Sequence, residues 1–250
     1  MSKKLAIILL YTLTALHATV LAQQHQSGLI PLDKSYEPRK ATPLSQYLDS
    51  MRLVYDRHYG VVVAEALNYL DNTQPQGTLA NILTDALLQI GDSLSFAIDG
   101  RNADLALLNF GGIREPIPAG PITLGKIFSV MPFDNNNIVL LDVQGAELRK
   151  MFFHNLRQLK DIQAFGNVRL EYHDSILESA TIGGEPIDDN RTYRLVTINF
   201  IENGGDKILE DVATKNILGE STPYRDRMIR YFRQKSKLHG VTDERVVISQ

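Results

Sequence analysis

The order of the apolar periodicities along the chain constrains its fold more than any other feature. Apolar residues recur at three- to four-residue spacing from Leu44 to Tyr55 and from Leu79 to Ile90, which predicts two amphipathic helices. Short apolar runs at 61–66 and 105–108 predict a strand after each helix. Strands outnumber helices in the second half of the chain. The pattern therefore predicts an α/β (α+β layered) fold class, in which helices flank mixed sheets.

The remaining elements follow from the same kinds of signal. Thr123 is expected to cap a short helix that ends near Val130, and Thr78 is expected to cap the helix that contains Leu79. The segment 116–121 is rich in proline and glycine and is expected to be a loop. Further strands are expected at 137–143, 167–172, 179–182, 192–199 and 245–248, and further helices at 148–156 and 224–238.

The first residues carry an export signal. Lys3 and Lys4 precede an apolar run at 5–21, and the run ends in small residues at Ala22, which indicates a signal peptide (1–22) cleaved after Ala22. A transmembrane anchor is the alternative. The run contains several polar residues, however, and polar glutamines follow it in place of a basic flank. We therefore expect a protein exported to the periplasm or the extracellular space, with no stable membrane insertion after cleavage.

Composition limits the organisation and the partners of the exported part. A polar segment with two prolines, 23–41, is expected to be a linker, and 42–250 is expected to be one domain. The chain has no cysteine, so the hydrophobic core must stabilise it without disulfides. The formal charge is −3, or −5 without Lys3 and Lys4, and the basic residues are scattered. This argues against nucleic acid as a partner, because binding a phosphate backbone requires a basic stripe.

Four short segments in a fixed order carry a family resemblance. They are TLANILTDA at 78–86, LNFGGIR at 108–114, VMPF at 130–133 and INFIENGGD at 198–206. Together they resemble the C-terminal, substrate-binding domain of the 5′-nucleotidase family, and the resemblance extends over about 72–209. It implies mixed sheets flanked by helices, and it implies that the chain binds a nucleoside 5′-monophosphate or a related nucleotide.

Phe133 and Phe200 match the family positions that hold the base. A purine is a flat π-system that gains roughly 1–3 kcal/mol from each aromatic face on which it stacks. Two phenylalanines on opposite faces would therefore select bases over other groups. Taken without the resemblance, a phenylalanine is more typical of a hydrophobic core.

Arg114 and the two glycines before it concern the phosphate side. Arg114 resembles the family arginine that engages the phosphate, and its guanidinium presents a planar fork to phosphate oxygens. It follows Gly111 and Gly112, where the backbone can come close to a ligand. The alternative is a surface arginine paired with Glu115 or Asp104.

Two polar residues match the family positions around the base and the sugar. Asn109 offers both an amide donor and an acceptor, as reading a base edge requires, and its family counterpart lines the base pocket. Asp206 can accept hydrogen bonds from two ribose hydroxyls, and its counterpart contacts the sugar. Both residue types are also common in turns, which is the alternative for each.

One departure from the family pattern affects the phosphate side. The family usually has an arginine and a glutamate shortly before the helix at 79–90, and that arginine helps to hold the phosphate. Here the corresponding segment 72–77 reads NTQPQG and has no charge. Half of the expected phosphate clamp is therefore missing, and Arg114 would carry most of the remaining contact.

The sequence offers no hydrolytic machinery. Phosphate ester hydrolysis in this family depends on two metal ions, whereas the histidines of this chain are scattered singly, without His-x-His or Asp-x-His. We therefore assign no catalytic residue, no metal ligand and no cofactor to the chain and expect it to be inactive alone. The expected partner is a separately encoded metallophosphoesterase that carries the divalent metals. The alternatives are an exported nucleotide- or nucleoside-binding protein without catalysis and a structural remnant that binds nothing.

Overall fold

The computed structural model describes residues 42–75, 77–157, 163–174, 176–218 and 222–249. The predicted signal peptide (1–22) and linker (23–41) lie outside these residues. By its internal contacts the chain divides into two units, Met1–Asp49 and Ser50–Gln250. Helix α2 (Pro43–Tyr59) begins in the first unit and ends in the second, and none of its residues is buried. The three sheets all lie in the second unit.

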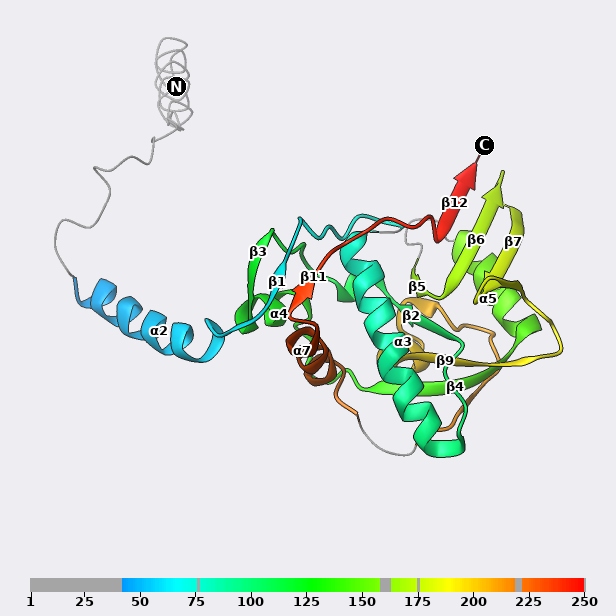
Figure 1. Ribbon diagram of the computed structural model, residues 1–250, viewed down its shortest axis with the longest axis horizontal. Coiled ribbons are helices and arrows are strands. Elements are labelled where there is room, and N and C mark those ends of the chain that lie inside the picture. Colours follow the sequence, from blue (N-terminus) through cyan, green and yellow to red (C-terminus); the bar gives the residue numbers. More distant parts are fainter. Residues whose placement is uncertain (1–41, 76, 158–162, 175, 219–221, 250) are drawn as a thin grey trace, which may run out of the picture. The chain divides into compact units, whose positions relative to one another are not determined.

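A five-stranded sheet forms the centre of the second unit (Figure 1). Its strand order is β10 (Thr214–Asn216), β4 (Ile138–Gln144), β9 (Thr192–Ile198), β2 (Leu105–Leu108) and β5 (Ala164–Gly166). Strands β2 and β9 are parallel, and the other neighbours are antiparallel. Every residue of β2 is buried, because helix α3 (Thr78–Asp99) packs against β2, β5 and β9. The hydrophobic core lies between this helix and the sheet.

Two smaller sheets and four helices complete the second unit. The three-stranded sheet has the order β11 (Lys237–Leu238), β1 (Val62–Ala66), β3 (Gly120–Thr123), and the four-stranded sheet has the order β12 (Val246–Ser249), β6 (Val168–His173), β7 (Ile176–Ile182), β8 (Glu185–Pro186). The helices are α4 (Leu124–Val130), α5 (Gly145–Arg157), α6 (Asn199–Glu202) and α7 (Tyr224–Lys235). Both parallel and antiparallel pairs occur, so the predicted α/β class with mixed sheets flanked by helices is confirmed.

Some local predictions are wrong. The helix expected at 224–238 ends at Lys235, and Lys237–Leu238 form strand β11, which pairs with β1. The last residues of segment 116–121 form the start of strand β3 and not a loop, because they pair with Glu65 and Ala66 of β1. Thr78 does not cap α3 but is its first residue. Its hydroxyl donates to Asp71 Oδ2 at 2.9 Å and accepts from the Asp71 amide at 3.0 Å, so it fastens the preceding loop instead. The cap at Thr123 is confirmed, since its side chain accepts from the Lys126 amide.

A buried arginine joins the end of α3 to the central sheet. The Arg194 side chain is only 3% exposed and donates to Asp99 and Asp142, with a further bond to Ser95 Oγ at 2.8 Å. An arginine this deeply buried is stable only when paired, and here all of its donors are used. The pKa of Asp99 is lowered, first by its hydrogen bond from Arg194.

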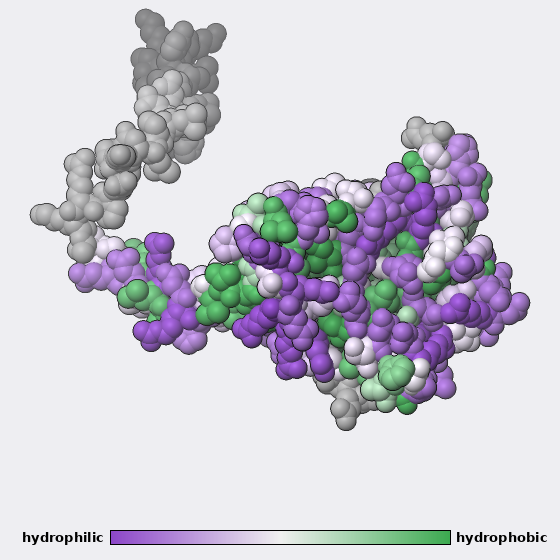
Figure 2. Space-filling view, viewed as in Figure 1, coloured by the Kyte–Doolittle hydropathy of each residue, from purple (hydrophilic) through white to green (hydrophobic). Residues whose placement is uncertain are grey.

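The surface of the described residues is mixed in character. Figure 2 shows hydrophilic side chains over most of the visible face of the second unit, with apolar patches between them. None of the helices within the described residues combines the length and the apolar content that crossing a membrane requires.

Candidate functional site

A cavity of about 700 Å³ opens at one edge of the central sheet. Strands β2 and β9 are parallel, so their carboxyl ends meet at this edge, and the antiparallel strand β4 begins there. The residues that follow β2 and β9 and those that precede β4 therefore converge. The lining residues are Asn109, Gly111, Gly112, Arg114, Phe133, Asn135, Asn136, Asn199, Phe200, Asn203, Gly204, Gly205 and Asp206.

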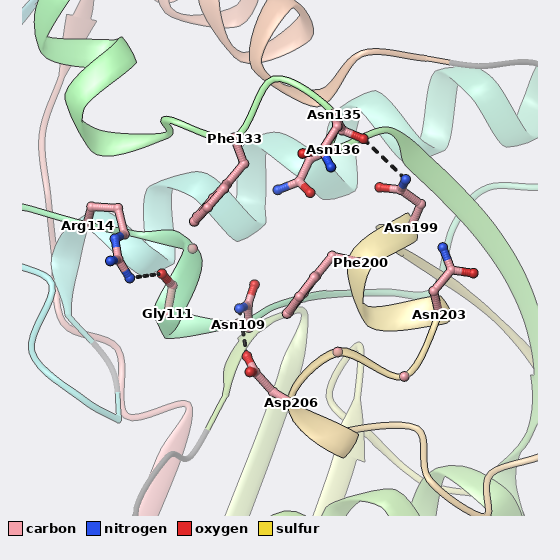
Figure 3. A pocket seen from close by; sticks show the side chains of 13 residues that line it. Asn109, Gly111, Arg114, Phe133, Asn135, Asn136, Asn199, Phe200, Asn203 and Asp206 are labelled. Atoms are coloured by element: carbon pink, nitrogen blue, oxygen red, sulfur yellow. Dashed lines mark hydrogen bonds between the residues drawn. The ribbon is translucent and has the colours of Figure 1, made fainter.

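The structure brings together all six residues that the sequence singles out. Asn109, Gly112, Arg114, Phe133, Phe200 and Asp206 all line this cavity, although they come from three separate segments of the chain. Figure 3 labels all of them except Gly112. The volume is within the range of roughly 300–1,000 Å³ that is usual for small-molecule sites. The individual roles of the six residues stay predictions.

Phe133 and Phe200 point into the cavity from two different segments (Figure 3). Phe133 follows α4, and Phe200 lies on the short helix α6. Their exposed fractions are 43% and 41%, so neither ring belongs to the hydrophobic core. The Phe200 ring lies directly against Gly205, where an added Cβ would overlap ring carbons. Glycine at 205 thus allows the ring to lie close against the following turn.

Arg114 stands beside the Phe133 ring. Its Cζ lies 5.9 Å from the ring centroid, and its Nη1 donates to the Gly111 carbonyl at 3.0 Å. The carboxylates considered as alternative partners bind other cations: Glu115 pairs with Lys126 at 3.1 Å, and Asp104 pairs with Arg101 and Arg191. The guanidinium is therefore held at the rim of the cavity, separate from those two carboxylates.

Asn109 and Asp206 are joined to each other. Asn109 is buried at the end of β2, and its Nδ2 donates to Asp206 Oδ2 at 2.7 Å (Figure 3). Asp206 lies in a 3₁₀ turn, Gly205–Lys207, with φ 52° and ψ 13°. This left-handed conformation is uncommon outside glycine, asparagine and aspartate. The hydrogen bond from Asn109 holds the Asp206 carboxylate in place. It also uses one of the two side-chain amide protons of Asn109, which the sequence analysis assigns to reading a base edge.

The comparison with known families decides what kind of domain this is. A family model described as 5′-nucleotidase, C-terminal domain, matches residues 60–212. The chain belongs to the 5′-nucleotidase family. The match contains all six predicted site residues, and the family resemblance of the four ordered segments is confirmed.

Individual relatives agree with this assignment. Protein UshA of Yersinia enterocolitica is 36% identical over 116 residues, which are 45% of this chain and 21% of UshA. The trifunctional nucleotide phosphoesterase protein YfkN of Bacillus subtilis is 27% identical over 236 residues, which are 88% of this chain and 16% of that protein. The 5′-nucleotidase precursor of Thermus thermophilus has the same fold, with a TM-score of 0.69 at 23% identity over 82% of this chain and 44% of that chain. This chain thus spans less than half the length of each of these relatives.

The segment that departs from the family pattern lies next to Arg114. The Asn72 side chain donates from Nδ2 to the Ile113 carbonyl at 3.2 Å. The uncharged loop is therefore adjacent in space to the arginine that lines the cavity. The side chain that contacts the residue before Arg114 in this 5′-nucleotidase C-terminal domain is thus a neutral amide.

Sequence reasoning missed four asparagines of the cavity, namely Asn135, Asn136, Asn199 and Asn203. Asn199, the first residue of α6, links this helix to the loop that carries Phe133. Its Oδ1 accepts from the Asn137 amide at 2.9 Å, and its Nδ2 donates to the Asn135 carbonyl at 3.2 Å. In the sequence, asparagines 135 and 136 follow Phe133 closely, and Asn199 directly precedes Phe200. Because asparagine is common in turns, these positions do not stand out as site residues.

Metal ligands are a separate question from the cavity. Over the described ranges there is no group of three or more histidine, cysteine, aspartate or glutamate side chains that could hold a metal ion. The residues of the cavity offer amides, one carboxylate and one guanidinium. The amides can both donate and accept hydrogen bonds, the carboxylate accepts them and the guanidinium donates them.

Proposed function

We propose that this chain binds a nucleotide, with the base between Phe133 and Phe200. Asp206 would accept the ribose hydroxyls, and Arg114 would contact the phosphate end. The observation that carries this proposal is the convergence of these side chains, from three segments, on one cavity of about 700 Å³ at the edge of the central sheet. Family membership supports it, because the matched domain is that of 5′-nucleotidases.

The chemistry of the cavity favours a nucleoside over a simple phosphate ester. Two half-exposed aromatic rings offer stacking surfaces that a sugar phosphate cannot use, and each stacked face contributes roughly 1–3 kcal/mol. A single guanidinium offers much less to a phosphate than the paired cations of a full clamp. Most of the affinity is therefore expected from the base and the ribose.

Calorimetric titration of the purified chain with AMP, adenosine and ribose 5-phosphate tests this proposal. We expect AMP and adenosine to bind and ribose 5-phosphate to bind at least roughly tenfold more weakly, which corresponds to the loss of base stacking. Equal affinity for AMP and ribose 5-phosphate would refute the role of the base, and binding of none of the three would refute the proposal as a whole.

We propose further that this subunit acts in nucleotide breakdown with a separately encoded metallophosphoesterase, which supplies the divalent metals. The motivation is a base-binding cavity in a chain whose described residues have no candidate metal group. The chain alone should release no phosphate from AMP. Mixing it with a candidate metallophosphoesterase should raise phosphate release above that of the metal subunit alone, and a mixture without any gain would rule out that pairing.

A non-catalytic, exported nucleotide- or nucleoside-binding protein is the second candidate. The uncharged loop beside Arg114 favours it, because a nucleoside receptor needs no phosphate clamp. Equal affinity for AMP and adenosine, together with no stimulation of any metallophosphoesterase, would select it. Both candidates require export, which we propose occurs by cleavage after Ala22. Mass analysis of the mature protein would show a first residue of Gln23.

A further inference from the structure

The loop that carries Phe133 rests on the first residue of helix α7 and the two residues before it. The Tyr224 amide donates to the Asn136 carbonyl at 3.0 Å, and the Ile138 amide donates to the Thr222 carbonyl at 2.7 Å. Asn137 and Pro223 also form an isolated β-bridge. Residues 222–224 therefore hold the backbone at 136–138, which follows Phe133 along the chain.

Arg225 extends this support to the residues directly before Phe133. Its Nη1 donates to two successive carbonyls, that of Met131 at 3.2 Å and that of Pro132 at 3.0 Å. Both carbonyls lie outside regular structure, since α4 ends at Val130. One charged group thus holds the two peptide units directly before Phe133, and the second of them ends in the Phe133 amide nitrogen and so helps to set the direction of the Phe133 side chain.

The guanidinium of Arg225 is itself held in place. Its Cζ lies 4.0 Å from the centroid of the Phe128 ring, which is close for a cation over an aromatic face. The Tyr59 ring meets Phe128 edge-on at 5.3 Å and fixes it from another side. The Arg225 Nε is buried and has no hydrogen-bond partner among the described residues. An unpaired buried donor is unfavourable. The contacts of the guanidinium with the Phe128 ring and the two carbonyls therefore outweigh this cost.

We propose that Arg225 is a positioning residue for the base site: it fixes Phe133 at the angle required for stacking, without touching the ligand. Arg225 is not among the described residues that line the cavity, so any effect on binding must pass through the loop. This inference rests on the proposed function, because it matters only if Phe133 stacks on a base. Lysine could keep a charge near the two carbonyls, but it has no planar guanidinium to lie flat over the Phe128 ring while one of its nitrogens binds them, so lysine should support the loop less well.

Calorimetry on the full chain tests the proposal with Arg225→Met, and Arg230→Met is the matched control because Arg230 is exposed on the same helix. We expect Arg225→Met to lower the affinity for adenosine roughly tenfold, which is within the range of one lost stacking face. It should leave the affinity for ribose 5-phosphate unchanged, because that ligand has no base. Arg230→Met should change neither. An equal loss for both ligands would indicate general damage to the cavity and would overturn the proposal.

A double-mutant cycle separates this inference from the proposed function. In a Phe133→Ala background, Arg225→Met should have no further effect on adenosine affinity, because the group it positions is gone. The same loss in both backgrounds would show that Arg225 acts elsewhere. If Phe133→Ala alone has no effect, the base site is wrong; if only Phe133→Ala has an effect, the inference about Arg225 is wrong. Should Arg225→Met fail to fold, Arg225→Lys takes its place, with a smaller but still base-dependent loss expected.

Discussion

Truncation of Phe133 to alanine should separate binding from stability more clearly than any other change. Complete burial of a phenylalanine makes its truncation cost about 3–5 kcal/mol of unfolding free energy. Phe133 is 43% exposed, so we expect a cost of only about 2–3 kcal/mol, in proportion to the buried part. Loss of one stacking face should cost about 1–3 kcal/mol of binding, which is roughly a 5- to 150-fold weaker affinity for adenosine.

The assay is calorimetric titration with adenosine, combined with urea unfolding of the same preparations. Phe153→Ala is the matched control, because Phe153 is 41% exposed on α5 and does not line the cavity. Phe153→Ala should lower the free energy of unfolding by a similar amount and leave the affinity for adenosine unchanged. If Phe133→Ala changes the affinity less than about twofold, below the range expected for a stacked face, or if Phe153→Ala weakens binding equally, the stacking argument is refuted.

Three further predictions concern the other side of the cavity and the support of the sheet. Gly205→Ala should push the Phe200 ring out of place, since the new Cβ would overlap it, and lower adenosine affinity roughly tenfold in calorimetry; an unchanged affinity would argue against Phe200 as the second stacking face. Asp206→Asn should weaken binding of adenosine by about 1.5–3 kcal/mol but leave free adenine unaffected, because only the former has a ribose; equal losses would place the carboxylate on the base. The pKa of Asp99 is lowered in the folded state, first by the Arg194 hydrogen bond, so its contribution to stability is present above the ordinary carboxyl pKa and is lost as the pH falls through the lowered value. Urea unfolding at a series of pH values should show a shallower acid-side loss of stability for Asp99→Asn, and an unaltered profile would contradict the linkage.

Much of the fold was predictable because its central elements carry strong local signals. The strand at 105–108 is buried at every position and has a continuous apolar run, and α3 has an apolar face at helical spacing. Strand β10 carries no such signal: all three of its residues are exposed, and it exists because it pairs with β4. Strand β3 also lacks a local strand signal, because the glycine and proline at its start favour a loop. It forms because its pairing with β1 outweighs this local preference.

The candidate site shows a similar division between local and tertiary information. The six predicted residues stand in motifs that are recognisable along the chain, and the structure gathers them at one cavity. The bond between Asn109 and Asp206 and the link from Asn199 to the Phe133 loop depend on which strands are neighbours. Arg225 was beyond sequence reasoning because its basic neighbours on α7 are scattered over the helix, and only the fold shows that one of them reaches the carbonyls before Phe133.

A crystal structure of the mature chain with AMP tests the central claim most directly. The account predicts a purine ring between Phe133 and Phe200, ribose hydroxyls at hydrogen-bond distance from Asp206, and the phosphate toward Arg114. A nucleotide bound elsewhere on the chain, or one in the cavity with its base directed away from both phenylalanines, would contradict the account.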